Sequence, residues 1–534
     1  MVAKGGSKDE GEGDFGDLGW VFGEDGEVSR LRFYALLGGV IVLLLIGAVW
    51  LVKLRGDWEW EATRKELVAK GEKLTMAELA PPEVGDERNF FGDAMWREIV
   101  EKREKTAGDW EVIYLPAVRK DMQQLSIFWA KLPGTEIAQL KEDFPKLADS
   151  GYGKPRSGVL NPFTRESKEK DEAVRKDGAR FVLAVLKPEE AMLGRISELL
   201  KRPEARFPLD YTDVSPVNNF PHVVPVLYIG QAYTARALAE IQLGQSEAAF
   251  RDALDLIGLS HTTRGDPFVL SQAVRATMVG YGLGVIRVGI AAEAWTDAEL
   301  ITFDEKLKEE DFLPDLLKAM RGERAATNLL AESFEMGGPK RYELMVKNST
   351  EWEDRDKGTV WDRQMAVLWM RAYLPMLMRF DQAYSNRLIQ EMIDALVASS
   401  WKGMMAKPLH EAPAEYRLPF FRLTHRFTVS GASTWYATMM KLAYTQDIVG
   451  QARIACGLER YYLAKKEYPE SLEALVPEYM SAVPGDILTG TAMHYKRTEP
   501  GAFLLWANGW DGRDNGGRKP ERGKHDGDWV WGKP

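Results

Sequence analysis

Residues 33–52 read FYALLGGVIVLLLIGAVWLV, twenty consecutive positions without a charged side chain. Two basic residues precede this stretch, Arg30 and Arg32, and two follow it, Lys53 and Arg55. A helix rises about 1.5 Å per residue, so the stretch would be roughly 30 Å long, the thickness of the hydrocarbon core of a bilayer. The sequence therefore predicts a single transmembrane anchor over residues 31–55.

Two other interpretations of the apolar stretch are less favoured. A buried helix of a soluble domain rarely runs this far without a polar residue. A cleaved signal peptide would start nearer the first residue, carry a shorter apolar run and be followed by a small-residue cleavage site. Neither description fits, so we expect a large domain held at a membrane.

The composition limits the class of protein. The chain has 534 residues, a formal net charge of −10, 45% hydrophobic residues and 28% charged residues. These fractions are typical of a folded globular chain, and the acidic balance argues against a nucleic-acid-binding protein. The single cysteine, Cys456, excludes an internal disulfide framework and a cysteine-rich zinc site. It falls in an apolar helical pattern, so we expect a buried structural thiol.

The chain divides by composition into five parts. Residues 1–30 are acidic and rich in glycine, which predicts a disordered tail before the anchor. Residues 56–215 and 216–444 show mainly helical periodicity, including the segment from Asn89 to about Leu147. Residues 445–534 mix one helix with short strand patterns. The expected fold is mainly α, with a small C-terminal α+β module.

One segment of the second helical part has a more specific pattern. In Tyr233–Leu259, small and apolar residues recur at helical spacing on both sides of Gly244. This pattern resembles the helix–turn–helix unit of tetratricopeptide proteins, in which small residues let paired helices approach closely. No strict 34-residue recurrence follows, so a plain α-hairpin in an irregular helical domain is the favoured interpretation.

The search for catalytic chemistry finds no recognisable motif. There is no metalloprotease, nucleophile-elbow, kinase or Walker signature. His410 with Glu411, and His425 further on, are the nearest approach to a metal or acid–base cluster, but nearby prolines remove helical ligand spacing. Ser260 and His261 are adjacent only in sequence. We predict no catalytic residues and no enzyme, although residues that converge only in space would escape this search.

The last ninety residues carry the most informative order of elements. A helix predicted over 445–466 ends at Tyr468-Pro469, and a short helix is expected within SLEALVPEYM at 471–480. A turn follows at 486–490. Three strands are then predicted, at 493–496, 503–507 and 529–531, with a polar loop rich in glycine and aspartate at 508–528. Together they predict a small three-stranded antiparallel sheet.

These pieces resemble the globular part of the major pseudopilin of type II secretion systems. The matching stretches are LERYYLAKKEYPESLEALVP, GDILTG, HYK, FLLWANGWDGRDNGG and DWVW. The family's proline after the turn aspartate is replaced by Ile487, and the family's N-terminal methylation motif and hydrophobic stem are absent from this helix. The resemblance implies a pseudopilin-like module that does not polymerise through such a stem.

The rest of the chain is similar to a group of bacterial single-span membrane-anchored helical proteins. The stretches that carry this likeness are LVAKGEKLTMAELAPPEVGDERNF after the anchor, RPEARFPLDY at 202–211 and LGQSEAAFRDALDLIGLS. This resemblance covers most of the chain, but it implies no activity.

The pseudopilin resemblance implies a calcium site in the loop at 508–528. The candidate ligands are Asp511 and Asp514 from the first limb and Asp526 and Asp528 from the second. Calcium takes six to eight oxygen ligands, and glycine-rich turns let backbone carbonyls point inward. The alternative is a solvated acidic loop without an ion, whose charge is offset by the basic residues Lys519, Arg522 and Lys524.

These features favour a non-enzymatic, membrane-anchored scaffold or interaction protein of the bacterial envelope, in a secretion-related setting. We expect protein partners and a membrane, but no nucleic acid; the sequence does not predict the oligomeric state. The basic residues Arg64, Lys65 and Lys70 after the anchor weakly favour a cytoplasmic location for the large domain. Against this signal, a calcium loop implies that the large domain is periplasmic and that the N-terminus is cytoplasmic, in the inner membrane. The rival interpretation is an envelope hydrolase whose active site lies in the helical domain.

Overall fold

The computed structural model describes residues 26–105, 113–115, 125–127, 172–211, 220–336, 360–406, 425–498, 501–521 and 526–532. Its internal contacts divide the chain into two units. The first comprises residues 1–62 and 337–383, and the second comprises residues 63–336 and 384–534. Two predicted features, most of the N-terminal tail and the pair His410-Glu411, lie outside the described residues.

The predicted anchor is part of one long helix, α1 (Gly26–Ala69). Its apolar side chains are exposed, with Leu43, Leu44 and Leu51 each about two-thirds accessible. The span from Arg32 to Ala69 has a window of mean hydropathy 2.8 with none of it buried, so α1 is a candidate membrane span. The helix begins before the expected boundary at residue 31 and continues well beyond residue 55.

The second unit is mainly helical. Besides short 3₁₀ turns, the helices that lie in it entirely are α2 (Met76–Leu79), α3 (Ala94–Lys105), α6 (Glu172–Leu186), α7 (Glu190–Leu199), α9 (Val223–Gln242), α10 (Ser246–His261), α11 (Val269–Ala291), α12 (Asp297–Lys308), α13 (Leu313–Met336), α16 (Gly403–Ala406) and α18 (Arg426–Lys465). Helix α15 (Val360–Ser399) contributes its second half to this unit. Helices α9, α10, α11, α12 and α18 form the centre of the core.

The hairpin predicted around Gly244 is present. Helices α9 and α10 pack against each other, and Gly244 adopts a positive φ of 78°, which a residue with a Cβ rarely tolerates. Ala235, Ala239 and Ala253 are buried along the hairpin, as the pattern predicts. The helical hairpin is therefore confirmed, while its tetratricopeptide character stays a prediction.

Helix α11 is an apolar helix of the core. It is long and apolar enough to pass a test for a membrane span, but 67% of its most apolar window is buried. Two glycines allow close contacts with its neighbours. Gly282 faces Ile257 of α10, where a Cβ would lie 3.4 Å away, and Gly289 accommodates the ring of Trp295. Gly280, by contrast, has open space beside it.

Helix α13 passes very close to the loop that precedes α11. A Cβ built on Gly322 would lie 1.6 Å from the carbonyl oxygen of Pro267, so no larger residue fits without moving backbone. This loop also places Phe268 in a small separate core with Ala325 of α13 and Met76 of α2. The contact fixes α13 against the start of α11, where the candidate pocket described below is formed.

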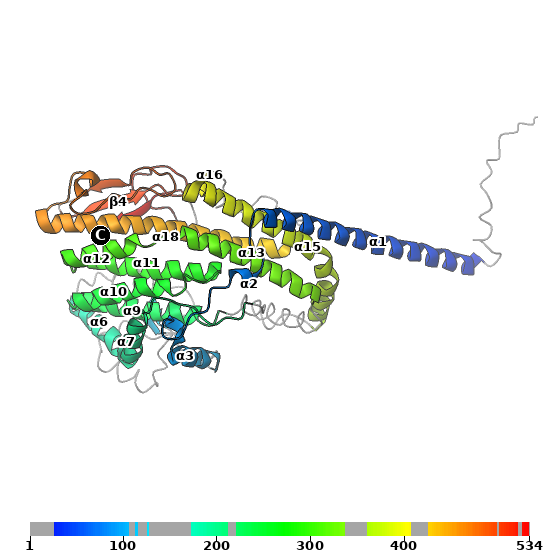
Figure 1. Ribbon diagram of the computed structural model, residues 1–534, viewed down its shortest axis with the longest axis horizontal. Helices are drawn as coiled ribbons and strands as arrows, with labels where there is room; N and C mark the ends of the chain where they lie inside the picture. Colours follow the sequence, from blue (N-terminus) through cyan, green and yellow to red (C-terminus); the bar gives the residue numbers. More distant parts are fainter. Residues whose placement is uncertain are drawn as a thin grey trace, which may run out of the picture. The chain divides into compact units, whose positions relative to one another are not determined.

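The three-stranded antiparallel sheet is confirmed. Strands β3 (His494–Arg497), β4 (Phe503–Ala507) and β5 (Trp529–Gly532) pair in that order, with His494 opposite Trp506 and Ala507 opposite Trp529. Figure 1 shows the sheet on one side of α18, with α11 and α12 on its other side, in agreement with the contacts between these elements. Helix α18 is thus the common wall of the helical core and the C-terminal module.

Some predicted elements differ from the structure. Helix α18 begins at Arg426, so the boundary expected between residues 444 and 445 falls inside one continuous helix. The short helix expected at 471–480 is only a 3₁₀ turn, Leu472–Leu475. Helix was expected from Asn89 to about Leu147, but β1 (Ile113–Leu115) and β2 (Leu125–Ile127) inside this segment are antiparallel strands, so the expectation is wrong at these residues. Both strand segments are rich in β-branched or large apolar side chains, which favour strands.

Candidate functional site

The loop predicted to hold calcium is closed by Asp528, whose side chain is fully buried at the start of β5. Its two carboxylate oxygens accept the N–H of Asn515 at 3.0 Å, and one of them also accepts the N–H of Gly517 at 2.7 Å. The N–H of Asp528 donates to the carbonyl of Arg518 at 2.8 Å. Asp528 therefore ties the two limbs of the loop together through backbone N–H donors.

Asp514 belongs to the other limb and is half-exposed. One carboxylate oxygen accepts the indole N–H of Trp506 at 2.9 Å and the N–H of Gly516 at 2.8 Å. The hydrogen bond from Trp506 is the main reason why the pKa of Asp514 lies below its usual range. The second oxygen is 3.6 Å from Nδ1 of His494, whose ring stacks on Trp506. Asp514 thus fastens the loop to the face of the sheet.

The remaining two aspartates are arranged differently. Asp511 accepts the N–H of Arg513 at 3.1 Å and the side-chain amide of Asn515 at 3.0 Å. The carboxylate of Asp526 is exposed and lies 4.0 Å from the guanidinium of Arg518. Among the residues described, no group of three or more Asp, Glu, His or Cys side chains is arranged to hold a metal ion. Calcium binding by this loop stays a prediction.

A buried acid pair that sequence analysis missed lies beneath the loop. Asp486, in the predicted turn, accepts the N–H groups of Leu488, Thr489 and Asn508 at 2.8–2.9 Å. Asp447, on α18, is fully buried and accepts the side-chain amide of Gln451 at 2.8 Å. Burial, together with the nearby charge of Asp486, raises the pKa of Asp447 to about 7.

The histidines of the helical core take part in buried polar networks. Nε2 of His222 is 2.8 Å from Asp266, and the hydroxyl of Ser271 donates to that same carboxylate at 2.9 Å. Serine and histidine therefore share an acid instead of contacting each other, and the imidazole is fully buried under the ring of Phe207. The cluster therefore does not show the direct contact between a hydroxyl nucleophile and its base.

A second network centres on Arg275, which is fully buried. Its guanidinium is 2.6 Å from Glu310 and 2.7 Å from Asp315. Glu310 also contacts His261 at 2.5 Å. The adjacent Ser260 donates to a backbone carbonyl, not to this imidazole. Of the other predicted histidines, His425 has its ring against Tyr384 of α15.

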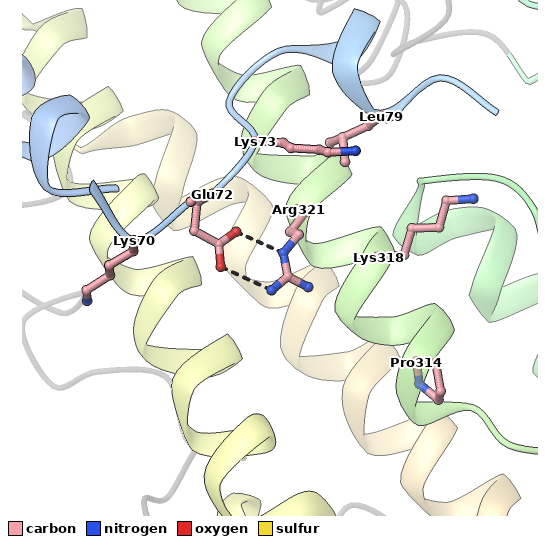
Figure 2. A pocket seen from close by; sticks show the side chains of 8 residues that line it. Lys70, Glu72, Lys73, Leu79, Pro314, Lys318 and Arg321 are labelled. Carbon is pink, nitrogen blue, oxygen red and sulfur yellow. Dashed lines mark hydrogen bonds and ion pairs between the residues drawn. The ribbon is translucent and has the colours of Figure 1, made fainter. Parts of the chain in front are cut away.

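A basic pocket of about 360 Å³ lies within the second unit. One wall is the segment that follows α1, with Lys70, Glu72 and Lys73, and Figure 2 shows the opposite wall on α13, with Lys318 and Arg321. Gly71, Leu79 and Pro314 complete the lining. The two walls are separated by more than 230 positions in sequence, so no local pattern reveals the pocket.

The only acid of the pocket lining is held by arginines. Arg321 donates to the two carboxylate oxygens of Glu72 at 2.8 and 3.0 Å, as the dashed lines in Figure 2 mark. Arg324, fully buried behind Arg321, also donates to Glu72. Burial alone would raise the pKa of Glu72, but the hydrogen bonds and charges of the two arginines lower it. Glu72 is therefore an ionised residue with its acceptors in use.

The two lysines nearest the opening between the walls have backbone partners. Lys73 donates to the carbonyl of Glu78 at 3.0 Å, and Lys318 donates to the carbonyl of Gly265. Burial lowers the pKa of Lys318, and the positive charge of Lys73 lowers it further, against the opposing effects of Asp266 and Asp315. The charges of Lys73 and Lys318, which line the same pocket, thus oppose each other.

Comparisons with family models, with curated proteins and with solved structures give no match for this chain.

Proposed function

We propose that this protein is a non-enzymatic, membrane-anchored scaffold or interaction protein of the bacterial envelope. The observation that carries the proposal is the exposed apolar surface of α1 over residues 33–52. A dozen large apolar side chains, each about half to two-thirds exposed, would cost roughly 10–20 kcal/mol to leave in water. A bilayer removes that cost and accepts a helix of this length.

The polar chemistry of the second unit supports a structural role. Several of its buried charged residues are paired with one another: Arg275 with Glu310 and Asp315, and Glu72 with Arg321 and Arg324. Removing charged groups from water is tolerated when they are paired and hydrogen bonded, and such pairs fix the arrangement of helices. A scaffold needs this fixed arrangement.

The C-terminal module is proposed to be pseudopilin-like, placed in a secretion-related assembly and stabilised by calcium. This part of the proposal is supported by the order of the elements: a helix, Tyr-Pro, an aspartate turn, three strands and the closing DWVW. A calcium loop would be useful outside the cytosol, where such sites bind at about 10⁻⁴–10⁻³ M. The proposed topology therefore places the N-terminus in the cytoplasm and the large domain in the periplasm.

The anchor and the topology are tested by two cellular experiments. Extraction of membranes with alkaline carbonate should leave the full chain in the pellet, whereas a variant that lacks residues 1–55 should be released. Protease added to intact spheroplasts should degrade the large domain and spare a short N-terminal fragment. Release of the full chain would refute the anchor, and complete protection of the large domain would reverse the topology.

The scaffold role is tested by crosslinking in intact cells followed by purification. We expect the same discrete protein partners from the full chain on repeated purification. The control carries a different apolar helix at residues 33–52, so that it remains in the membrane with the same large domain. Loss of the partners in this control would assign them to the anchor, and a strictly solitary protein would contradict the scaffold role. Hydrolysis of envelope material by the purified chain would favour the rival hydrolase.

A further inference from the structure

We infer that the pocket between residues 70–79 and α13 binds a phosphate group. Four of its lining residues are cationic, namely Lys70, Lys73, Lys318 and Arg321, and one is acidic, Glu72. Such an excess of positive charge around a cavity is costly unless it is neutralised. The inference does not depend on the proposed scaffold role.

Two of the four cations of the pocket lining already have acidic partners. Arg321 is paired with Glu72, and Lys70 lies within 3.2 Å of Glu66 and 3.6 Å of Asp394. Figure 2 shows the ammonium group of Lys70 directed to the far side of Glu72, away from Lys318. Of the four cations of the lining, Lys73 and Lys318 therefore remain.

Lys73 and Lys318 remain without a carboxylate partner within ion-pair distance among the described residues. The acids whose charges reach Lys318 have other partners, since Asp266 is shared by a histidine and a serine, and Asp315 by two arginines. The carboxylate of Glu78, near Lys73, caps helix α2 by accepting from Thr75. Within the described parts of the chain, no acid therefore bridges the two lysines.

The ammonium groups of Lys73 and Lys318 have N–H donors beyond those that bind backbone carbonyls. Each carries three N–H donors, and each uses one on a backbone carbonyl, which leaves two on each lysine. Figure 2 draws Lys73 on the segment that follows α1 and Lys318 on α13, with the ammonium group of Lys318 directed away from the Glu72–Arg321 pair. An oxyanion between them would accept several charge-assisted hydrogen bonds and would remove the repulsion between the two lysines.

The size and the charge of the pocket favour phosphate over a carboxylate. At about 30 Å³ per water molecule, a space of about 360 Å³ corresponds to roughly a dozen waters. It therefore accommodates a phosphate with part of its hydration, or a small phosphate ester. Two lysines neutralise the double charge of a phosphate monoester, whereas a carboxylate carries one charge. The phosphate could belong to a soluble compound or to a lipid headgroup.

The test is equilibrium binding of inorganic phosphate to the full-length chain in detergent, at constant ionic strength. We expect saturable binding, and we expect Lys73→Gln and Lys318→Gln each to weaken it by about 10- to 100-fold, the effect of one charge-assisted hydrogen bond. Lys201→Gln is the matched control, because Lys201 is exposed and paired with Glu198 away from the pocket. Lys73 is exposed, so its variant keeps the test valid if Lys318→Gln fails to fold.

Nanodiscs distinguish the two sources of phosphate. If a headgroup fills the pocket, nanodiscs that contain phosphatidic acid should weaken the binding of free phosphate compared with detergent, and Lys73→Gln should abolish this competition. Equal affinity in nanodiscs and detergent would indicate a soluble phosphate compound. The inference is overturned if phosphate does not bind saturably at millimolar concentration. It is equally overturned if both pocket variants bind as tightly as the Lys201→Gln control.

Discussion

Asp528→Asn is the substitution that most directly tests how the C-terminal loop is held. The side chain is fully buried and accepts the N–H groups of Asn515 and Gly517. Asparagine keeps the shape, but it offers one neutral oxygen and turns an NH₂ group toward the other donor. Losing one charge-assisted hydrogen bond and leaving one buried N–H unpaired should cost about 2–4 kcal/mol.

The assay for this substitution is hydrogen exchange of the full-length chain in detergent, followed by mass spectrometry of peptides from the loop. A loss of 2–4 kcal/mol in local stability corresponds to exchange that is faster by about 30- to 700-fold, at 1.4 kcal/mol per factor of ten. Asp526→Asn is the matched control, because its exposed carboxylate only approaches Arg518. We expect that control to change exchange by no more than about twofold.

Two results would refute this reasoning in different ways. Unchanged exchange in Asp528→Asn would show that the buried N–H bonds do not hold the loop. Calcium at a hundredfold excess over its Kd should slow exchange in the wild type by about 100-fold, which is about 2.7 kcal/mol, and should do nothing in Asp528→Asn. If calcium and a chelator give the same exchange in the wild type, the calcium prediction fails while the role of Asp528 stands.

Three further predictions concern the core of the second unit. Asp447, with its pKa near 7, keeps a proton in the folded state that the unfolded chain releases above pH 4. The free energy of unfolding should therefore fall between pH 4 and 7, by up to roughly 4 kcal/mol. Denaturant titrations should show this slope disappear in Asp447→Asn, and a persistent slope would assign it to other groups. Arg275→Met removes a buried cation from Glu310, which keeps its contact with His261, and from Asp315, which keeps Arg264. It should lower the unfolding free energy by about 3–5 kcal/mol, whereas Lys201→Met should change it by less than about 1 kcal/mol. Equal effects in denaturation would contradict the burial argument. Gly322→Ala should lower the unfolding free energy by more than about 2 kcal/mol, because the new Cβ clashes with the backbone of Pro267. Gly280→Ala should stabilise α11 by about 0.5–1 kcal/mol, because the position has open space. A thermal melt that ranks the two variants the other way would refute the packing described.

The sequence was most informative where a local pattern had only one physical solution. No charged side chain interrupts the run from Phe33 to Val52, so a long exposed apolar helix follows from composition alone. Strand β4 was predicted with its observed limits, Phe503–Ala507, because turn residues bound it on both sides. The hairpin at Gly244 was predicted for the same reason.

Features that depend on distant residues could not be predicted from one sequence. Glu72 and Arg321 look like ordinary surface charges until the fold brings them together. Asp447 falls in a helical pattern in which an isolated acid is expected to face solvent, but the fold buries it beside the turn that contains Asp486 and Ile487. The hairpin β1–β2 lay within a segment whose apolar spacing also fitted a helix, so periodicity alone did not decide between them.

The position of α18 between the helical core and the sheet also has a consequence for biosynthesis. The face of α11 that α18 covers is complete at Ala291, but α18 itself is complete only at Lys465, roughly 170 residues later. At about 5–20 residues per second, the ribosome needs on the order of 10–35 s to supply the missing helix. During this interval the face of α11 that α18 later covers stays exposed in the nascent chain, and it is then that a chaperone has reason to bind it.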